Sequence, residues 1–376
     1  MATRHRHEIH ALEATLFPIY ARVFTSGFDF FTHAISGDPD SPRINSRINS
    51  RIISFTVRGM NAAIASNTRT RQEILERVLR GIERNRTPGY HFAGNLLALS
   101  FDRLDEQQAI VTMPAGAHCT DRDGQANMAA LCILADIALA SAVRGALKRG
   151  MRLATVNLQL QLTGARRAGD LTAQADFNGY YREGAAQQGL SRVSVRSNED
   201  EICFGNGAFM VLEPPPGFKL PPMLPLPEST PGPLLKPEGP SAAETRIYRQ
   251  TQAALDEMDS GGSFIEHLWR FRTRKNSGGA SASLANGAHV GNRVGHVQGG
   301  ILLGLAEAAA RAALPAHWKL SALTACYLSP GEGTTLSARA KIVHQGSRTA
   351  VVHGVITGVN RRRVLETVAT YAAPAR

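Results

Sequence analysis

The sequence has no hydrophobic run long enough to cross a membrane. Its longest nearly apolar stretch, Met128–Val143, has 16 residues and carries Asp136 at its centre. A spanning helix needs about 20 apolar residues and tolerates a central charge poorly. The N-terminal segment has no compact apolar core, so no signal peptide is expected, although its Arg and His content leaves a transit peptide open. We expect a cytoplasmic protein without a membrane partner.

Cysteine and aromatic residues are also scarce. The four cysteines are scattered, without a C-x-x-C pair or a histidine spacing typical of zinc, which favours free thiols and no metal site. Aromatic residues make up 6% of the chain, and no lysine or arginine stripe alternates with them. A nucleic-acid partner is therefore not expected, in spite of the net charge of +11.

Proline is concentrated in one segment, which predicts a domain boundary. Residues 213–240 hold 11 of the 19 prolines, so they form neither a helix nor a central strand and act as an extended linker. Residues 1–65 contain the repeat RINSRINSRI and are expected to be a poorly packed appendage, and Met60 remains open as an alternative start. Two domains remain, over residues 66–212 and 241–376.

These two domains repeat one pattern, an apolar helix followed by short strands with period-2 alternation. The helices are expected over Asn127–Lys148 and Gly299–Leu314, and a further helix over Thr70–Arg84. The segment LCILADIA of the first long helix aligns with LLGLAEAA of the second at an offset of 171, which places Asp136 over Glu307. The strands at 171–175 and 336–340 align at an offset of 165.

The strands that follow the two long helices are expected in matching order. Strand-like stretches also precede each long helix, over Gly94–Met113 and Phe264–Leu284. Those that follow are expected at Thr155–Leu162, Leu171–Asn178, Leu190–Ser197, Ile202–Leu212, Leu320–Leu328, Leu336–His344, Thr349–Val359 and Val364–Ala372.

The second half carries a motif that resembles the hotdog-fold acyl-CoA thioesterases. NRVGHVQGGILLGLAE, from Asn292 to Glu307, is similar to the N-x(5)-H-G-G-x(6)-D/E signature of the phenylacetyl-CoA and 4-hydroxybenzoyl-CoA thioesterase type. Gln298 replaces the usual histidine, and the first-half counterpart, DRDGQANMA over 121–129, lacks the paired glycines. The resemblance implies an α+β double hotdog, two tandem domains that each wrap an antiparallel sheet around a long helix.

The resemblance also implies a chemistry, the hydrolysis of an acyl-CoA thioester to a free acid and CoA without a cofactor. Such a reaction needs hydrogen-bond donors at the carbonyl oxygen and a carboxylate that attacks or activates water. Free amides at a helix N-terminus supply the donors, and burial raises the basicity of a carboxylate. Gly299 and Glu307 are eight residues apart, about 12 Å along one helix, so the carboxylate must come from the other helix.

Two composite sites are therefore expected between the paired domains. One joins Gly299, Gln298 and Asn292 to Asp136, and the other joins Glu307 to the first-half turn, where a methionine crowds the approach. The first is favoured, since Glu307 has Arg311 one turn away and could be a structural ion pair. The catalytic candidates are Asp136, Glu307, Gly299, Gln298 and Asn292, and the substrate-binding candidates are Gly300, Asn127, Met128 and Asp121.

Other functions stay open at this point. Loss of the first-half glycines and the substitution at Gln298 also fit a non-catalytic acyl-CoA-binding or regulatory protein, whereas a hotdog dehydratase would need a histidine arrangement that the sequence lacks. The basic excess would suit the phosphates of CoA. The acyl chain, the number of active sites and the oligomeric state, whether monomer or homodimer, are left undetermined.

Overall fold

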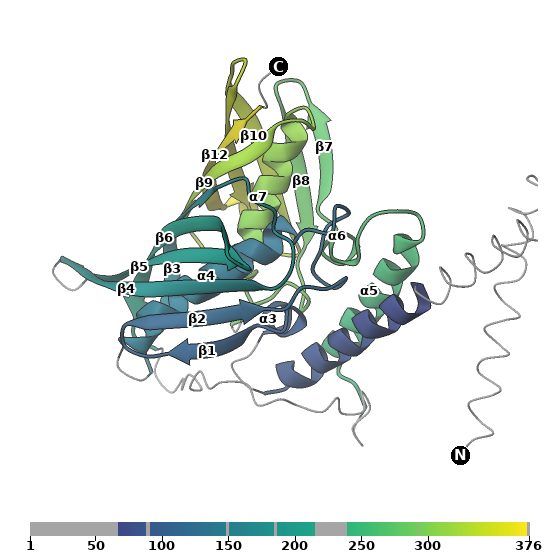
Figure 1. Cartoon of the computed structure of the whole chain (residues 1–376), viewed down its shortest axis with the longest axis horizontal. Helices are drawn as coiled ribbons and strands as arrows, with labels where there is room; N and C mark the ends of the chain where they lie inside the picture. The colour runs from purple at the N-terminus through teal and green to yellow at the C-terminus, as the bar shows by residue number, and fades with distance from the viewer. Residues whose placement is uncertain are drawn as a thin grey trace, which may run out of the picture. The chain divides into compact units, whose positions relative to one another are not determined.

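A computed structural model gives the structure of most of the chain in two halves, each with a long helix against its own strands (Figure 1). It describes residues 67–87, 91–147, 150–183, 186–214, 239–292 and 294–373.

The first half opens with a helix over residues 67–85, close to the predicted Thr70–Arg84. Its other elements are α3 (Phe92–Leu96), β1 (Ser100–Leu104), β2 (Gln108–Met113), α4 (Met128–Gly145), β3 (Arg152–Leu162), β4 (Leu171–Glu183), β5 (Ala186–Ser197) and β6 (Asp200–Leu212).

The second half repeats this order. Its elements are α5 (Ala242–Met258), α6 (Phe264–Trp269), β7 (Arg272–Asn276), β8 (Gly279–Ala285), α7 (Gly299–Ala313), β9 (Lys319–Tyr327), β10 (Thr335–Gln345), β11 (Thr349–Thr357), the short helix η1 (Val359–Arg361) and β12 (Arg363–Ala372). The predicted α+β double hotdog is confirmed.

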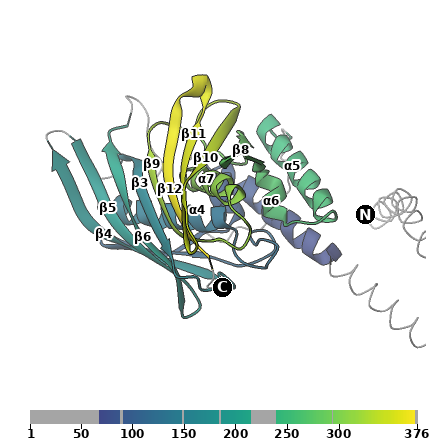
Figure 2. The same cartoon turned by 90° about the horizontal axis from the view of Figure 1, so that it is seen from above.

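One antiparallel sheet of 12 strands runs through both halves in the order β1-β2-β4-β5-β6-β3-β9-β12-β11-β10-β8-β7. The halves join where β3 pairs with β9, from Asn157 opposite Cys326 to Gln161 opposite Ala322. Asn157 strengthens this junction, because its side-chain amide donates to the carbonyl oxygen of Ala325 at 3.0 Å. Figure 2 shows β3 and β9 side by side between the two sets of strands.

The segments predicted as strands ahead of each long helix begin instead as helices. In Phe92–Leu96 the His91 ring nitrogen accepts from the Gly94 amide at 3.1 Å, and in Phe264–Trp269 the Glu266 carboxylate accepts from the Ser263 amide at 3.0 Å. These caps favour a short helix. The apolar run alone did not separate a buried helix turn from a buried strand; only β1–β2 and β7–β8 are strands.

The two long helices cross at backbone contact, and glycine makes this possible. A Cβ atom at Gly300 would lie 2.4 Å from the Ile133 amide nitrogen, and one at Gly304 would lie 2.3 Å from the Ala129 Cβ. Because Gly300 aligns with Ala129 and Gly304 with Ile133, these are the same contact seen from each half. The crossing therefore relates the two halves by an approximate two-fold axis.

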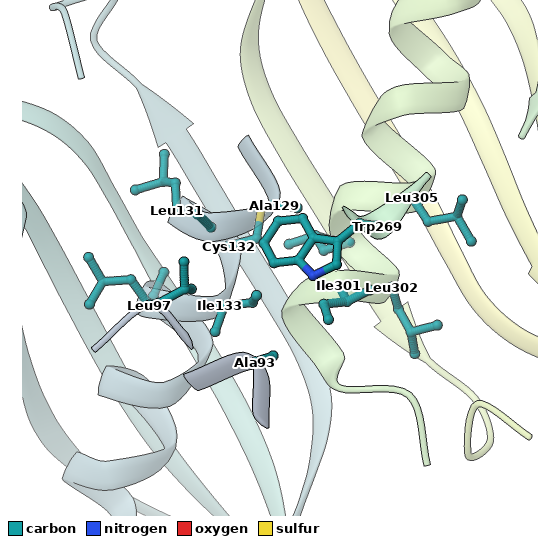
Figure 3. Close-up of a cluster of buried hydrophobic side chains, with 14 of the residues drawn as sticks. Ala93, Leu97, Ala129, Leu131, Cys132, Ile133, Trp269, Ile301, Leu302 and Leu305 are labelled. Atoms are coloured by element: carbon teal, nitrogen blue, oxygen red, sulfur yellow. The ribbon is translucent and has the colours of Figure 1, made fainter. Parts of the chain in front are cut away.

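Apolar side chains from both halves cover this crossing. Trp269, 2% exposed, comes from α6 of the second half, and Figure 3 shows its indole among side chains that include Cys132 of α4 and Ile301 of α7. These residues belong to one continuous core. The two central helices and the sheet therefore share a single hydrophobic interior.

Helix α4 has the length and apolar composition of a membrane span, but most of it is buried inside the fold. It packs against α7 and against strands of its own half, which accounts for its apolar composition as that of a core helix.

The predicted domain boundaries stay predictions. The appendage over 1–65, with the question of Met60, lies outside the described residues, as do 215–238 of the linker. On either side of that linker, β6 ends at Leu212 and α5 begins at Ala242.

Substitution of the crossing glycines should destabilise the fold. We expect Gly300→Ala and Gly304→Ala each to lower the free energy of unfolding by about 1–3 kcal/mol, because the added methyl meets backbone or a fixed side chain. Gly291→Ala, where the nearest atom lies at 3.6 Å, should change it by about 0.5 kcal/mol or less. Urea unfolding checks this, and equal stability of all three variants would contradict the crossing.

Candidate active site

Asp136 lies at the interface of the halves, in the middle of α4 and 6% exposed. Its Oδ2 accepts from the Gln298 side-chain amide of the second half at 2.9 Å, and its Oδ1 accepts from the Thr155 hydroxyl at 3.1 Å. Both oxygens are therefore held by neutral donors from different halves. The sequence spacing demanded a carboxylate from the other helix, and the structure places Asp136 there.

Gln298 has two tasks at the N-terminus of α7. Its Oε1 accepts from the Ile301 amide at 3.0 Å and so caps the helix, which leaves Nε2 pointing at Asp136. The cap thus fixes the orientation of the side-chain amide. A residue one methylene shorter would not serve both partners in the same way.

Gly299 is the first residue of α7 and lies directly beside Asp136. A Cβ atom at this position would come within 2.8 Å of Asp136 Oδ2. Any residue larger than glycine would therefore force either the carboxylate or the first turn of α7 to move. The amides of a first helical turn have no intrahelical acceptor and carry the positive end of the helix dipole. Since Gln298 accepts from the Ile301 amide, the amides of Gly299 and Gly300 are the first-turn donors that remain beside the carboxylate among the described residues.

Thr155 is a site residue that the sequence did not reveal. It sits in β3 next to an irregularity, because Thr155 pairs with Phe209 and Asn157 with Ala208, which leaves Val156 as an extra residue. A bulge of this kind re-aims neighbouring side chains. The alternation of the strand gave no sign of which residue would reach Asp136.

Tyr327 is a second residue that the sequence missed. Its hydroxyl donates to the carbonyl oxygen of Gly299 at 3.0 Å, and its ring edge lies 3.5 Å from the position of a Cβ at Gly299. Burial, followed by the nearby charge of Asp136, raises the pKa of Tyr327 well above its usual value. The phenol therefore stays protonated and holds the first turn of α7 in place.

Burial raises the pKa of Asp136 from 3.8 to about 6, against the lowering effect of the hydrogen bonds from Thr155 and Gln298. A carboxylate with a pKa near 6 is still ionised at neutral pH but is a stronger base than an exposed one. Perturbed carboxylates of this kind are common at catalytic sites.

Glu307 occupies the equivalent place in the second half with different surroundings. It is 5% exposed, and Arg311 on the same helix lies 3.5 Å from its Oε1. Burial raises the pKa of Glu307, while the positive charges of Arg311 and Arg167 oppose that rise. The Glu307 carboxylate is thus paired with an arginine, whereas the Asp136 carboxylate accepts hydrogen bonds from the neutral side chains of Thr155 and Gln298.

The hydrogen bond from Thr155 to Asp136 also has no counterpart at Glu307 among the described residues. The offset of 165 for the strands places Leu320 where Thr155 stands, and both lie beside an extra residue in the strand pairing. Leucine has no hydroxyl to donate. The two composite sites therefore share a carboxylate but differ in the groups that hold it.

The other predicted site residues stabilise turns or packing. Asn292 Oδ1 accepts from the amides of Val294 and His296, both at 3.0 Å, and in the first half Asp121 accepts from two amides of its own turn in the same way. Neither side chain is hydrogen-bonded to Asp136 or Glu307 among the described residues. They shape the turns that lead into α7 and α4.

The turn before α4 offers a less open approach than that before α7. Asn127 Oδ1 caps α4 by accepting from the Ala129 amide at 2.9 Å, and Met128, where the second half has glycine, packs against the hydrophobic core. Gly300 contacts the backbone of Ile133 and so serves the helix crossing. The structure brings Asp136, Gln298 and Gly299 together and keeps Glu307 apart from them.

Comparison with known proteins agrees with this architecture. Residues 289–372 match a family model described as the acyl-CoA thioesterase N-terminal domain, which confirms the resemblance to hotdog-fold acyl-CoA thioesterases and the class of thioester hydrolase. No curated protein matches the sequence.

Several solved structures are similar to parts of the chain. A protein from Bacillus halodurans, crystallised with CoA, is 24% identical over 36% of this chain and 96% of its own, with a TM-score of 0.33. A hot dog protein of unknown function from Alicyclobacillus acidocaldarius is 10% identical over 76% of this chain and 99% of its own, with a TM-score of 0.46. An acyl-ACP thioesterase from Bacteroides thetaiotaomicron is 12% identical over 70% of this chain and 97% of its own, with a TM-score of 0.42.

The raised pKa of Asp136 predicts a pH-dependent effect of Asp136→Asn on stability. A folded-state pKa above the unfolded value means that the buried charge costs stability above pH 6, and this cost fades as the pH falls toward 3.8. The variant should therefore gain stability relative to the parent as the pH rises from 5 to 8, by about 1 kcal/mol. Urea unfolding at both pH values measures it.

A matched control is Asp176→Asn, since the hydrogen bond from Gln108 holds the pKa of Asp176 below its usual range. That variant should gain no stability with rising pH. A pH-independent difference between Asp136→Asn and the parent would show that this carboxyl titrates normally.

Proposed function

We propose that this chain, whose residues 289–372 carry an acyl-CoA thioesterase domain, hydrolyses acyl-CoA at the composite site of Asp136, Gln298 and Gly299. One observation carries the proposal: a buried carboxylate of one half is hydrogen-bonded at 2.9 Å to the residue that caps the glycine-started helix of the other half. This places a base next to free amides, which are the two groups that thioester hydrolysis needs.

Asp136 acts as a general base on water in this proposal. Both of its oxygens already accept hydrogen bonds, from Thr155 and Gln298, which weakens the carboxylate as a direct nucleophile but leaves lone pairs for a water proton. The water oxygen attacks the thioester carbonyl carbon as its proton moves to Asp136. The reaction therefore begins with one proton transfer and one new C–O bond.

The first turn of α7 stabilises the tetrahedral intermediate. The carbonyl oxygen becomes an oxyanion, and the amides of Gly299 and Gly300 donate to it, helped by the helix dipole. When the C–S bond breaks, the CoA sulfur takes the proton from Asp136, which returns as a carboxylate. Tyr327 keeps this turn in place through its bond to the Gly299 carbonyl oxygen.

One active site per chain follows from the asymmetry of the two carboxylates. Burial raises the pKa of Glu307 as it does that of Asp136, but the charge of Arg311 opposes that rise and its guanidinium contacts Oε1, and the neighbouring first turn begins with Met128 rather than glycine. The proposed activity therefore belongs to Asp136, with Glu307 in a structural role.

Substitution of the two carboxylates separates these roles. Asp136→Asn should lower kcat by about 100-fold or more, because the base is lost, whereas Glu307→Gln should retain most of the activity. Release of free CoA, measured with a thiol reagent across a panel of acyl-CoA substrates, checks both. The reverse pattern would move the active site to Glu307, and no turnover of any substrate by the parent chain would refute the proposed function.

The pH profile provides an independent check on the base. Because Asp136 must be ionised and its pKa is about 6, kcat/KM should rise with pH through a midpoint near 6 and then level off. Glu307→Gln should leave that midpoint in place. A profile that is flat between pH 5 and 7.5 would argue against Asp136 as the base.

A further inference from the structure

Beyond the buried Asp136, α4 has a strip of residues that are less buried than their neighbours in the helix. Ile137, Ala140 and Arg144 are partly exposed, whereas the residues between them are buried. Ala140 and Arg144 follow Asp136 at intervals of four, so the three share one side of the helix. The strip therefore leads away from the proposed catalytic carboxylate along the helix axis.

Two hydrogen bonds show that this side of α4 faces the segment from Met151 to Thr155. Asp136 accepts from Thr155 at 3.1 Å, and one turn beyond Ala140, the Arg144 guanidinium donates to the carbonyl oxygen of Met151 at 3.4 Å. Ala140 therefore lies opposite the segment between Met151 and Thr155. In β3 the residue that shares the face of Thr155 within that segment is Leu153, which is also partly buried against the core.

The same place in the second half has a buried tryptophan and an exposed arginine. By the helix offset of 171, Arg311 stands where Ala140 does, and by the strand offset of 165, Trp318 stands where Leu153 does. Trp318 is 5% exposed, and Ala308, the counterpart of Ile137, is 5% exposed as well. The fold thus accepts bulkier residues at the positions of Ala140 and Leu153, and the half that carries Asp136 has the smaller residue at both, although Ile137 is larger than Ala308.

We propose that the acyl chain of the substrate lies along this strip, between Ala140 of α4 and Leu153 of β3, and that Ala140 sets the chain length accepted. The inference rests on the proposed thioesterase function. The strip is continuous with Asp136. The side chains of Ala140 and Leu153, which lie between the Asp136–Thr155 and Arg144–Met151 hydrogen bonds, are apolar, and this suits an alkyl chain rather than the amide-rich arm of CoA.

The length of the strip gives the expected substrate class. Asp136 and Arg144 are eight residues apart, about 12 Å along the helix. An extended chain of roughly ten carbons, with bonds of about 1.5 Å, spans that distance. Medium-chain acyl-CoA is therefore the expected substrate, with the chain end near the contact between Arg144 and Met151.

Two variants that fill the strip test the proposal independently. Ala140→Leu adds bulk on the helix, and Leu153→Trp introduces the residue that the second half has at this place. Each should lower kcat/KM for decanoyl-CoA relative to acetyl-CoA by about 10-fold or more, since a small change in an apolar pocket alters selectivity by this order. Hydrolysis of acetyl-CoA should persist, because Asp136 is unchanged.

Ala312→Leu is the matched control, because Ala312 is a partly exposed alanine of α7 outside the proposed strip. It should leave the ratio of the two kcat/KM values unchanged. Urea unfolding of each variant confirms that it is folded at the assay temperature.

The outcomes separate this inference from the function on which it rests. No hydrolysis of either substrate by the parent chain would refute the thioesterase proposal. Hydrolysis by the parent with an unchanged substrate ratio in both strip variants, or with the same shift in Ala312→Leu, would refute the acyl-chain position alone.

Discussion

The contact between α4 and α7 is the constraint on which the rest of the structure depends. Each half of the contact needs a small residue, since a Cβ atom at Gly300 would lie 2.4 Å from the Ile133 amide and one at Gly304 would lie 2.3 Å from Ala129. At this separation the Asp136 carboxylate accepts a hydrogen bond from Gln298, the residue that caps the other helix, at 2.9 Å. Helix packing and the proposed chemistry therefore share one geometric requirement.

The approximate two-fold symmetry of the crossing does not extend to the sites. Both halves place a carboxylate in the middle of the central helix, yet Asp136 is held by a threonine and a glutamine, and Glu307 has an arginine. Duplication supplies two equivalent positions, and the proposed reaction uses only one of them. The other position accepts bulkier neighbours, the buried Trp318 and the largely exposed Arg311.

Much of this arrangement was accessible from the sequence. The repeat at an offset of 171, the helices at Asn127–Lys148 and Gly299–Leu314, and the distance along one helix predicted that a carboxylate of one half would meet the glycines of the other. Thr155 and Tyr327 were not accessible, because the strand bulge and the packing of a ring on Gly299 decide their direction. The short helices ahead of β1 and β7 were missed because a buried helical turn and a buried strand have the same apolar pattern.

The neutral partners of Asp136 have opposite consequences for the stability of the buried charge and for the basicity of the carboxylate. An arginine beside a buried carboxylate would stabilise its charge but would also lower its pKa and occupy its lone pairs. Thr155 and Gln298 offset only part of the desolvation, so the pKa stays near 6 and the carboxylate is ionised but incompletely stabilised at neutral pH. At Glu307, where nothing reacts in the proposed scheme, the arginine is tolerated. The different partners of the two carboxylates are therefore consistent with the proposal that only Asp136 acts as a base.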